Sequence, residues 1–107
     1  MKQIKRETLK RMMDNDEDFV LIDARRHGGY DEGHLPGAIP IPADRIGEEM
    51  LKQYKKDSTI VTYCSGWDCE SSTIAAKKLD KYGFVNVLDF KGGLEEWKKA
   101  GYPLDKT

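Results

Sequence analysis

The sequence of 107 residues predicts an α/β protein with a mostly parallel central sheet and helices on both of its faces. Residues 19–23, 60–63 and 85–90 form short apolar runs, which are typical of strands buried in a parallel sheet. Helical segments lie between these runs, and such alternation implies right-handed βαβ connections. Because ligands bind outside the carboxyl ends of such strands, we expect the functional residues there.

The first half of the chain contains two weaker strand signals. Residues 2–4 are expected to form a short edge strand, and residues 7–14 form a helix because their apolar side chains share one face. The glycines and proline of residues 28–37 require turns. Residues 38–42 are expected to form another short strand, which must lie at an edge or a bulge because Pro40 cannot donate a hydrogen bond.

The rest of the chain is predicted to carry three helices. The first is expected to run from residue 43 to about residue 56. The second follows the strand at 60–63 and ends at Gly83, and the third is opened by Gly92 and Gly93 and stopped at 101–103. The apolar residues that mark these helices are Ala43, Ile46, Met50 and Tyr54, then Ala75, Leu79 and Tyr82, then Leu94 and Trp97.

Charge and hydropathy restrict the classes of partner. The 18 basic and 19 acidic residues nearly cancel, so no basic surface favours nucleic acid or membrane as a partner. No apolar run approaches the roughly twenty residues of a membrane span, and the first residues lack the apolar region of a signal peptide. We therefore expect one cytoplasmic domain over residues 1–107.

Cys64 is the candidate nucleophile. It lies where a strand ends and a helix is about to begin, and the positive end of a helix dipole favours a thiolate. The alternative is a small buried hydrophobic residue, which is the commonest role of a lone cysteine. Cys69 lies in the same loop, beside the flexible Gly66, and this combination favours chemistry over packing.

The two cysteines do not indicate a disulfide framework or a metal site. A bridge across five positions would connect nothing distant in the chain. A zinc site would need two further ligands, and His27 and His34 lie on another segment without ligand-like spacing. We therefore expect no metal and no cofactor.

The chain resembles the single-domain rhodanese family over nearly its full length. The resemblance is carried, in order, by residues 21–25, 33–38, Cys64, 92–97 and 101–103. It implies the three-layer rhodanese fold and a sulfurtransferase in which Cys64 takes the outer sulfur of thiosulfate or a persulfide. The sulfur is held as a Cys64 persulfide and passed to cyanide or to a thiol, which belongs to a small molecule or a protein. A non-catalytic sulfur carrier or partner-docking module on the same fold is the alternative.

The loop after Cys64 is expected to bind the substrate through its backbone N–H groups. The loop is longer than is usual in this family and lacks the arginine that ends the loops of rhodanese-like phosphatases and arsenate reductases, so we expect no useful phosphatase activity. Asp68 and Glu70 should face solvent, where they do not oppose an anion. The predicted substrate-binding residues are Ser65, Gly66, Trp67, Asp68, Cys69, Glu70 and Ser71.

Neighbouring residues are assigned supporting roles. Asp23 and Arg25 have two open roles, orienting the substrate or forming an ion pair that holds the following loop, and the ion pair is favoured. Arg26 or His27 is the nearest source of positive charge for the site. His34 and Trp97 are expected to be structural, and Trp67 to line the mouth of the pocket. Cys69 has two open roles, packing at the start of the helix or serving as a resolving thiol. The second requires the loop to bring the two α-carbons within about 4.4 to 6.8 Å.

Overall fold

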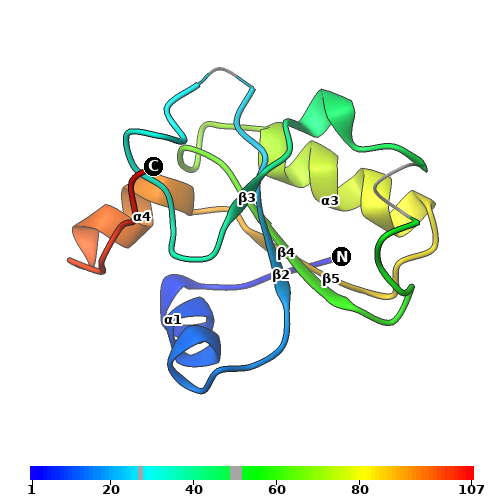
Figure 1. Cartoon of the computed structure of the whole chain (residues 1–107), viewed down its shortest axis with the longest axis horizontal. Coiled ribbons are helices and arrows are strands. Elements are labelled where there is room, and N and C mark those ends of the chain that lie inside the picture. Colours follow the sequence, from blue (N-terminus) through cyan, green and yellow to red (C-terminus); the bar gives the residue numbers. More distant parts are fainter. Residues whose placement is uncertain (27, 49–51) are drawn as a thin grey trace.

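A computed structural model describes residues 1–26, 28–48 and 52–107. Its core is a five-stranded sheet in the order β1-β5-β4-β2-β3, in which every neighbouring pair is parallel (Figure 1). This confirms the predicted sheet, including the two short strands at its edges. The strands are β1 (Lys2–Gln3), β2 (Val20–Asp23), β3 (Ile39–Pro40), β4 (Thr59–Tyr63) and β5 (Asn86–Phe90).

Helices cover both faces of the sheet, as predicted. Helices α1 (Arg6–Asp14) and α4 (Gly93–Lys99) lie on one face, and their buried side chains share a core with Leu21, Val61 and Tyr63. On the other face lie α3 (Ser71–Lys81) and the 3₁₀ turn η1 (Ala43–Arg45), which share a second core with Ile22 and Ile60. Successive strand residues point to opposite faces, so each inner strand contributes to both cores.

The predicted helix over residues 43–56 is wrong at both of its ends, and none of the described residues 52–56 is helical. Over residues 43–47 only the three residues of η1 are helical, and Ile46 is extended, with φ −72° and ψ 116°. Ala43 and Ile46 are both buried, so a single turn already places the apolar side chains in the core. Apolar residues at helical spacing can therefore be buried without a continuous helix. Met50 lies outside the described residues.

The register aligns the carboxyl ends of the three inner strands. Asp23 is opposite Tyr63, and Tyr63 is opposite Phe90. The residues that follow these strand ends, including Cys64 and Lys91, therefore lie at one edge of the sheet, where ligands of parallel sheets bind.

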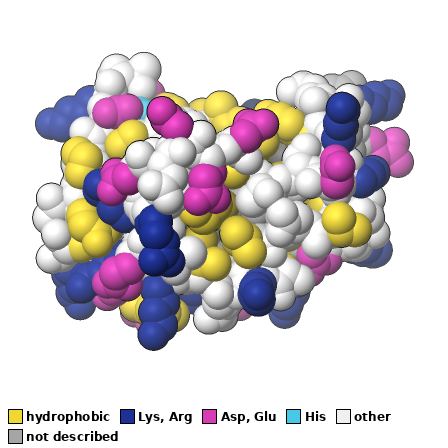
Figure 2. All heavy atoms as spheres, turned by 90° about the horizontal axis from the view of Figure 1, so that it is seen from below, with side chains coloured by type: hydrophobic (Ala, Val, Ile, Leu, Met, Phe, Trp, Pro, Cys, Tyr) yellow, Lys and Arg dark blue, Asp and Glu magenta, His cyan; other side chains and the backbone are white. Residues whose placement is uncertain are grey.

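The described part of the chain contains no helix that is long and apolar enough to cross a membrane. Seen from below, the surface carries basic and acidic side chains close together, with hydrophobic side chains between them (Figure 2).

Candidate active site

Cys64 lies directly beyond β4 and is fully buried. The backbone N–H of Ser72, the second residue of α3, donates a hydrogen bond to its sulfur at 3.4 Å. The start of α3 is thus aimed at the sulfur, and both the hydrogen bond and the helix dipole favour a thiolate at this position. The strand, loop and helix that the sequence predicted around Cys64 are all present.

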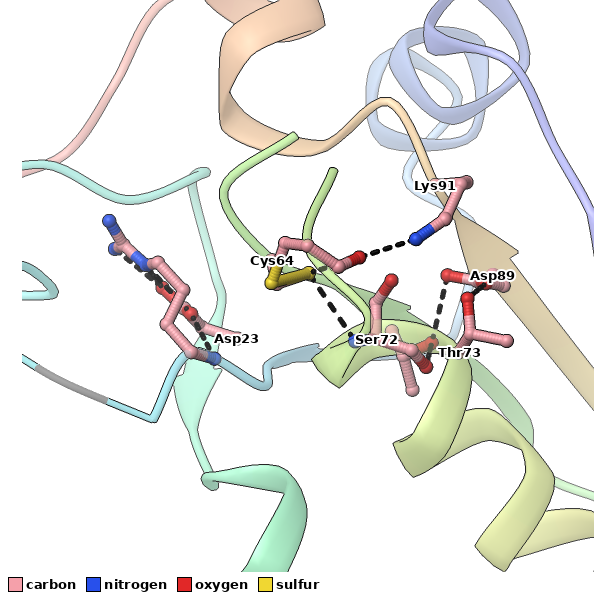
Figure 3. The surroundings of a disulfide bond; sticks show 9 residues. Asp23, Cys64, Ser72, Thr73, Asp89 and Lys91 are labelled. Carbon is pink, nitrogen blue, oxygen red and sulfur yellow. Dashed lines mark hydrogen bonds and ion pairs between the residues drawn. A yellow bond between two sulfur atoms is a disulfide. The ribbon is translucent and has the colours of Figure 1, made fainter. Parts of the chain in front are cut away.

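Cys64 is joined to Cys69 by a disulfide bond (Figure 3). The N–H of Cys69 donates to the Gly66 carbonyl at 3.0 Å, and this turn brings the two α-carbons to 6.3 Å. That separation meets the distance condition for a resolving thiol. The Cys64 sulfur also lies 3.3 Å from the carbonyl oxygen of Cys69. A reduced Cys64 thiol would donate a hydrogen bond to this oxygen.

The loop residues predicted to bind substrate differ in their exposure. Ser65, Trp67, Asp68 and Glu70 are exposed, Cys69 is half-buried, and Gly66 and Ser71 are buried. The two acidic side chains thus face solvent, as expected. In this disulfide-bonded state the described N–H group that reaches the Cys64 sulfur is that of Ser72, one residue beyond the predicted range of 65–71.

The first turn of α4 holds the beginning of the loop. The N–H of Leu94 donates to the Cys64 carbonyl and the N–H of Glu95 to the Ser65 carbonyl, each at 2.9 Å. Gly93 makes this approach feasible because it adopts φ +61°, and a Cβ atom there would overlap the Cys64 carbonyl oxygen. Gly93 therefore packs directly against the Cys64 carbonyl group.

Lys91 is a site residue that the sequence analysis missed. It follows β5, and its ammonium group donates a hydrogen bond to the Cys69 carbonyl oxygen (Figure 3). This brings a positive charge to a loop that contains no arginine or lysine. Lys91 lies between a predicted strand and two glycines, and this position could have indicated that it belongs to the site.

An open cavity of about 250 Å³ lies beside the loop and is lined by Arg25, Arg26, Ser65, Cys69 and Ser71. Arg26 is exposed there, while His27 lies outside the described residues. Trp67 does not line this cavity. It is 54% exposed and borders a different cavity of about 240 Å³, with Ile4 and Phe90. The side chain leaves the loop on the side of α4 instead.

Asp23 and Arg25 form the predicted ion pair. The guanidinium lies 2.7 Å from the Asp23 carboxylate and also donates to the Gly33 carbonyl at 2.9 Å, which ties down the loop after β2. Burial alone would lower the pKa of Arg25, but the hydrogen bonds and charge of Asp23 raise it above its ordinary value. With this partner, Arg25 is held as a structural cation.

Tyr63 connects this ion pair to β4. Its hydroxyl donates to Asp23 at 2.9 Å and accepts from the Leu35 N–H at 3.1 Å. Burial, and then the negative charge of Asp23, raise the pKa of the Tyr63 hydroxyl well above its ordinary value. The hydroxyl therefore remains a proton donor to Asp23 across the physiological pH range.

His34 and Trp97 have the structural surroundings that the sequence predicted. The His34 ring stacks on Tyr30 at a centroid distance of 3.8 Å, and its Nδ1 lies 2.6 Å from the Tyr30 carbonyl oxygen. Trp97 is fully buried and donates to the Pro103 carbonyl at 2.7 Å. Both side chains secure segments away from the sulfur.

A buried hydrogen-bond network beneath the site was also not predicted from the sequence. Asp89 is fully buried in β5 and accepts a hydrogen bond from the Thr73 hydroxyl at 2.7 Å. The Thr62 hydroxyl donates to the Ser72 carbonyl at 2.9 Å. These contacts anchor the start of α3 to two strands and thereby fix the Ser72 N–H. Within the described ranges, no cluster of three or more histidine, cysteine or acidic side chains is arranged to hold a metal ion.

Comparisons with known proteins agree with this architecture. Residues 5–100 match the family described as the Rhodanese-like domain. A Bacillus halodurans protein of known crystal structure is 33% identical, with a TM-score of 0.91 over 99% of this chain and 77% of that one. The rhodanese-like domain of an Anabaena sp. protein is 29% identical, with a TM-score of 0.87 over 100% of this chain and 80% of that one. A thiosulfate sulfurtransferase from Pseudomonas aeruginosa, 20% identical with a TM-score of 0.84 over 99% of this chain and 20% of its own, shows the shared fold.

Curated relatives from Yersinia enterocolitica and Yersinia pestis are named tRNA uridine(34) hydroxylase. Each is 33% identical over 111 residues, which is 94% of this chain but 31% and 30% of the respective relative. The chain thus spans about a third of the length of these relatives. The match over residues 5–100 and the shared fold show that the chain belongs to the rhodanese-like domain family.

Proposed function

We propose that the chain is a sulfurtransferase in which Cys64 carries a sulfane sulfur as a persulfide. The observation that carries this proposal is the setting of the Cys64 sulfur, which receives the N–H of Ser72 at the start of a helix. A sulfur in this setting is favoured as an anion, and the anionic forms of both a thiol and a persulfide are the reactive ones. Membership of the rhodanese-like family supports the same chemistry.

The reaction takes two displacements at sulfur. In the first, the Cys64 thiolate attacks the outer sulfur of thiosulfate or of a persulfide. A sulfur–sulfur bond forms to Cys64, the donor's own bond breaks, and sulfite or a thiolate leaves with the electron pair. In the second, cyanide or an acceptor thiolate attacks the outer sulfur, and Cys64 leaves as a thiolate. No net oxidation or reduction occurs, and no metal or cofactor is required by these steps.

The cavity beside the loop is where we place the incoming donor. It opens at Ser65, Cys69 and Ser71, and the exposed Arg26 is the cation that an anionic donor would meet. Arg25 is less suited to this role because Asp23 already occupies its guanidinium. Asp68 and Glu70 surround the loop with negative charge, so a small dianion such as thiosulfate should be a poorer donor than a persulfide.

Cys69 is proposed to be the resolving thiol. When no acceptor is present, the Cys69 thiol can attack the inner sulfur of the Cys64 persulfide. The Cys64–Cys69 bond forms, and hydrosulfide leaves with the proton of Cys69. An external dithiol then reduces the disulfide and restores Cys64. The disulfide thus protects Cys64 from irreversible oxidation between turnovers.

Mass spectrometry of the reduced protein, incubated with thiosulfate or inorganic polysulfide, tests the central claim. We expect the mass of one added sulfur atom in Cys69→Ser, the loss of two hydrogens in the wild type as Cys69 displaces the sulfur and closes the disulfide, and no addition at residue 64 in Cys64→Ser. An unchanged wild-type mass with both donors would remove the sulfurtransferase proposal.

Turnover distinguishes an enzyme from a stoichiometric carrier. We expect many equivalents of thiocyanate per protein when cyanide is supplied with polysulfide, and none above background for Cys64→Ser. A single equivalent would assign the chain as a sulfur carrier instead. Hydrolysis of an aryl phosphate that depends on Cys64 would contradict the predicted lack of phosphatase activity.

The whole-protein activity of the tRNA uridine(34) hydroxylases is not assigned to this chain. The chain spans about a third of those relatives, and its 18 basic and 19 acidic residues give it no excess of positive charge with which to hold a nucleic acid. Small sulfur donors and thiol acceptors are the partners that the site chemistry favours.

A further inference from the structure

The Ser72 hydroxyl is buried without a hydrogen-bond partner. Ser72 is 0% exposed, and within the described ranges its Oγ is the buried side-chain polar atom that has no partner. Such groups are rare because burial removes the hydrogen bonds that water would supply. An orphaned hydroxyl beside a candidate active site indicates that a partner is present in another state of the site.

The neighbouring polar groups are already paired. The Ser72 N–H donates to the Cys64 sulfur, and its carbonyl accepts from Thr62. Thr73 donates to Asp89. The hydroxyl therefore has no role in the network that anchors α3. Figure 3 shows the Ser72 side chain directed toward the side on which the Cys64–Cys69 bridge and Lys91 lie.

The Ser72 hydroxyl is suited to bind the outer sulfur of a Cys64 persulfide and not the Cys64 sulfur itself. The N–H of Ser72 reaches the Cys64 sulfur, but the hydroxyl makes no hydrogen bond to it. A persulfide places a further sulfur about 2.05 Å beyond the inner one. That outer sulfur carries the negative charge and accepts hydrogen bonds, so it can supply the partner that the inner sulfur does not.

We propose that Ser72 binds the sulfur cargo by donating its hydroxyl hydrogen bond to the outer sulfur of the Cys64 persulfide. This inference rests on the proposed sulfurtransferase function, and it assigns to that function a residue that acts only when Cys64 carries the persulfide. In the disulfide state the hydroxyl is buried and unpaired, which disfavours this state relative to the persulfide. The hydroxyl thereby stabilises the persulfide specifically, whereas the Ser72 N–H binds the inner sulfur of Cys64 whether or not a second sulfur is attached.

The test compares persulfide lifetimes in the Cys69→Ser background, in which no disulfide can drain the loaded state. The parent, Ser72→Ala and Ser58→Ala are loaded with inorganic polysulfide, freed of donor by gel filtration, and followed by mass spectrometry. Ser58 lies in the turn before β4 and serves as the matched control. We expect Ser72→Ala to lose its sulfur about tenfold faster than the parent, as for a hydrogen bond to a charged group. Ser58→Ala should match the parent.

Two further measurements separate binding of the cargo from a structural role. The pH dependence of Cys64 alkylation in the unloaded protein should be the same in Ser72→Ala and the parent, because the hydroxyl does not contact the inner sulfur. The melting temperature of unloaded Ser72→Ala should be equal or higher, because the substitution removes an unpaired buried hydroxyl.

Equal persulfide lifetimes, or a lower melting temperature for Ser72→Ala, would overturn the assignment of Ser72 while leaving the sulfurtransferase proposal intact. A parent protein that gains no sulfur from polysulfide would overturn both.

Discussion

The Lys91 ammonium group donates a hydrogen bond to the carbonyl oxygen of Cys69, and that same oxygen lies 3.3 Å from the Cys64 sulfur. One backbone atom thus connects the end of β5 to the nucleophile at the end of β4. The loop itself carries Asp68 and Glu70 but no arginine or lysine. Lys91 therefore brings to the sulfur a positive charge that the loop lacks.

Replacing Lys91 with methionine should raise the pKa of the Cys64 thiol, because a nearby cation favours the thiolate. The measurement is the rate of iodoacetamide alkylation against pH in the Cys69→Ser background, where Cys64 is the sole thiol. Lys91→Arg should retain the wild-type profile because it keeps the charge. Lys77→Met, on the exposed side of α3, provides the matched control. Identical profiles for the two methionine variants would show that Lys91 only supports the loop.

Removing Cys69 should leave Cys64 open to irreversible oxidation. Treated with mild peroxide, the reduced wild type should lose the mass of two hydrogens and recover it with dithiothreitol, because Cys69 closes the disulfide across a 6.3 Å α-carbon separation. Cys69→Ser should instead gain two oxygens as Cys64 sulfinic acid and lose its sulfurtransferase activity permanently. If the wild type over-oxidises at the same rate, Cys69 is a packing residue.

Tyr63→Phe should destabilise the fold at neutral pH by about 1 to 3 kcal/mol, because Asp23 and the Leu35 N–H lose a buried partner. The penalty should shrink in alkali. The folded-state pKa of Tyr63 is raised, so the stability that its proton contributes is present below the ordinary tyrosine pKa of about 10 and is lost as the pH rises beyond it.

Urea unfolding of the wild type and Tyr63→Phe at about pH 8 and about pH 10.5 tests this dependence. The difference in unfolding free energy should be smaller at the higher pH. Tyr82→Phe, at the exposed end of α3, controls for the loss of any tyrosine. A difference that grows with pH would contradict the assigned direction of the shift.

Gly93→Ala should destabilise the protein by more than about 2 kcal/mol. Gly93 adopts φ +61°, and an added Cβ would overlap the Cys64 carbonyl oxygen and approach the Gly66 nitrogen to 3.0 Å. Gly101 adopts a similar φ of +74° with no atom within 4 Å of the added Cβ. Gly101→Ala should therefore lower the free energy of unfolding only by the cost of a left-handed backbone at alanine, about 1 kcal/mol. Urea unfolding measures both, and equal losses would show that the contact with Cys64 is readily relieved.

The strands and most helices were predictable from the sequence because their signals are local. A buried parallel strand needs a short run of β-branched and apolar residues, and 19–23, 60–63 and 85–90 supply such runs. Residues 43–56 show the limit of this reasoning. Ala43 and Ile46 are buried by a 3₁₀ turn and an extended residue, so helical spacing did not require a helix.

The sequence by itself determined that Cys64 follows a strand and precedes a helix, since both signals lie within a few residues of it. Only the tertiary structure decided which groups surround the sulfur. Strand order places β5 beside β4, and this pairing brings Lys91 to the loop from 22 positions along the chain and Asp89 to the start of α3 from 16 positions. The direction of a side chain within a loop is equally a tertiary property: the Trp67 ring lies beside Gly92, where an added Cβ would come within 3.4 Å of it. Local propensities set each element, but the contacts between distant elements set the chemistry at Cys64.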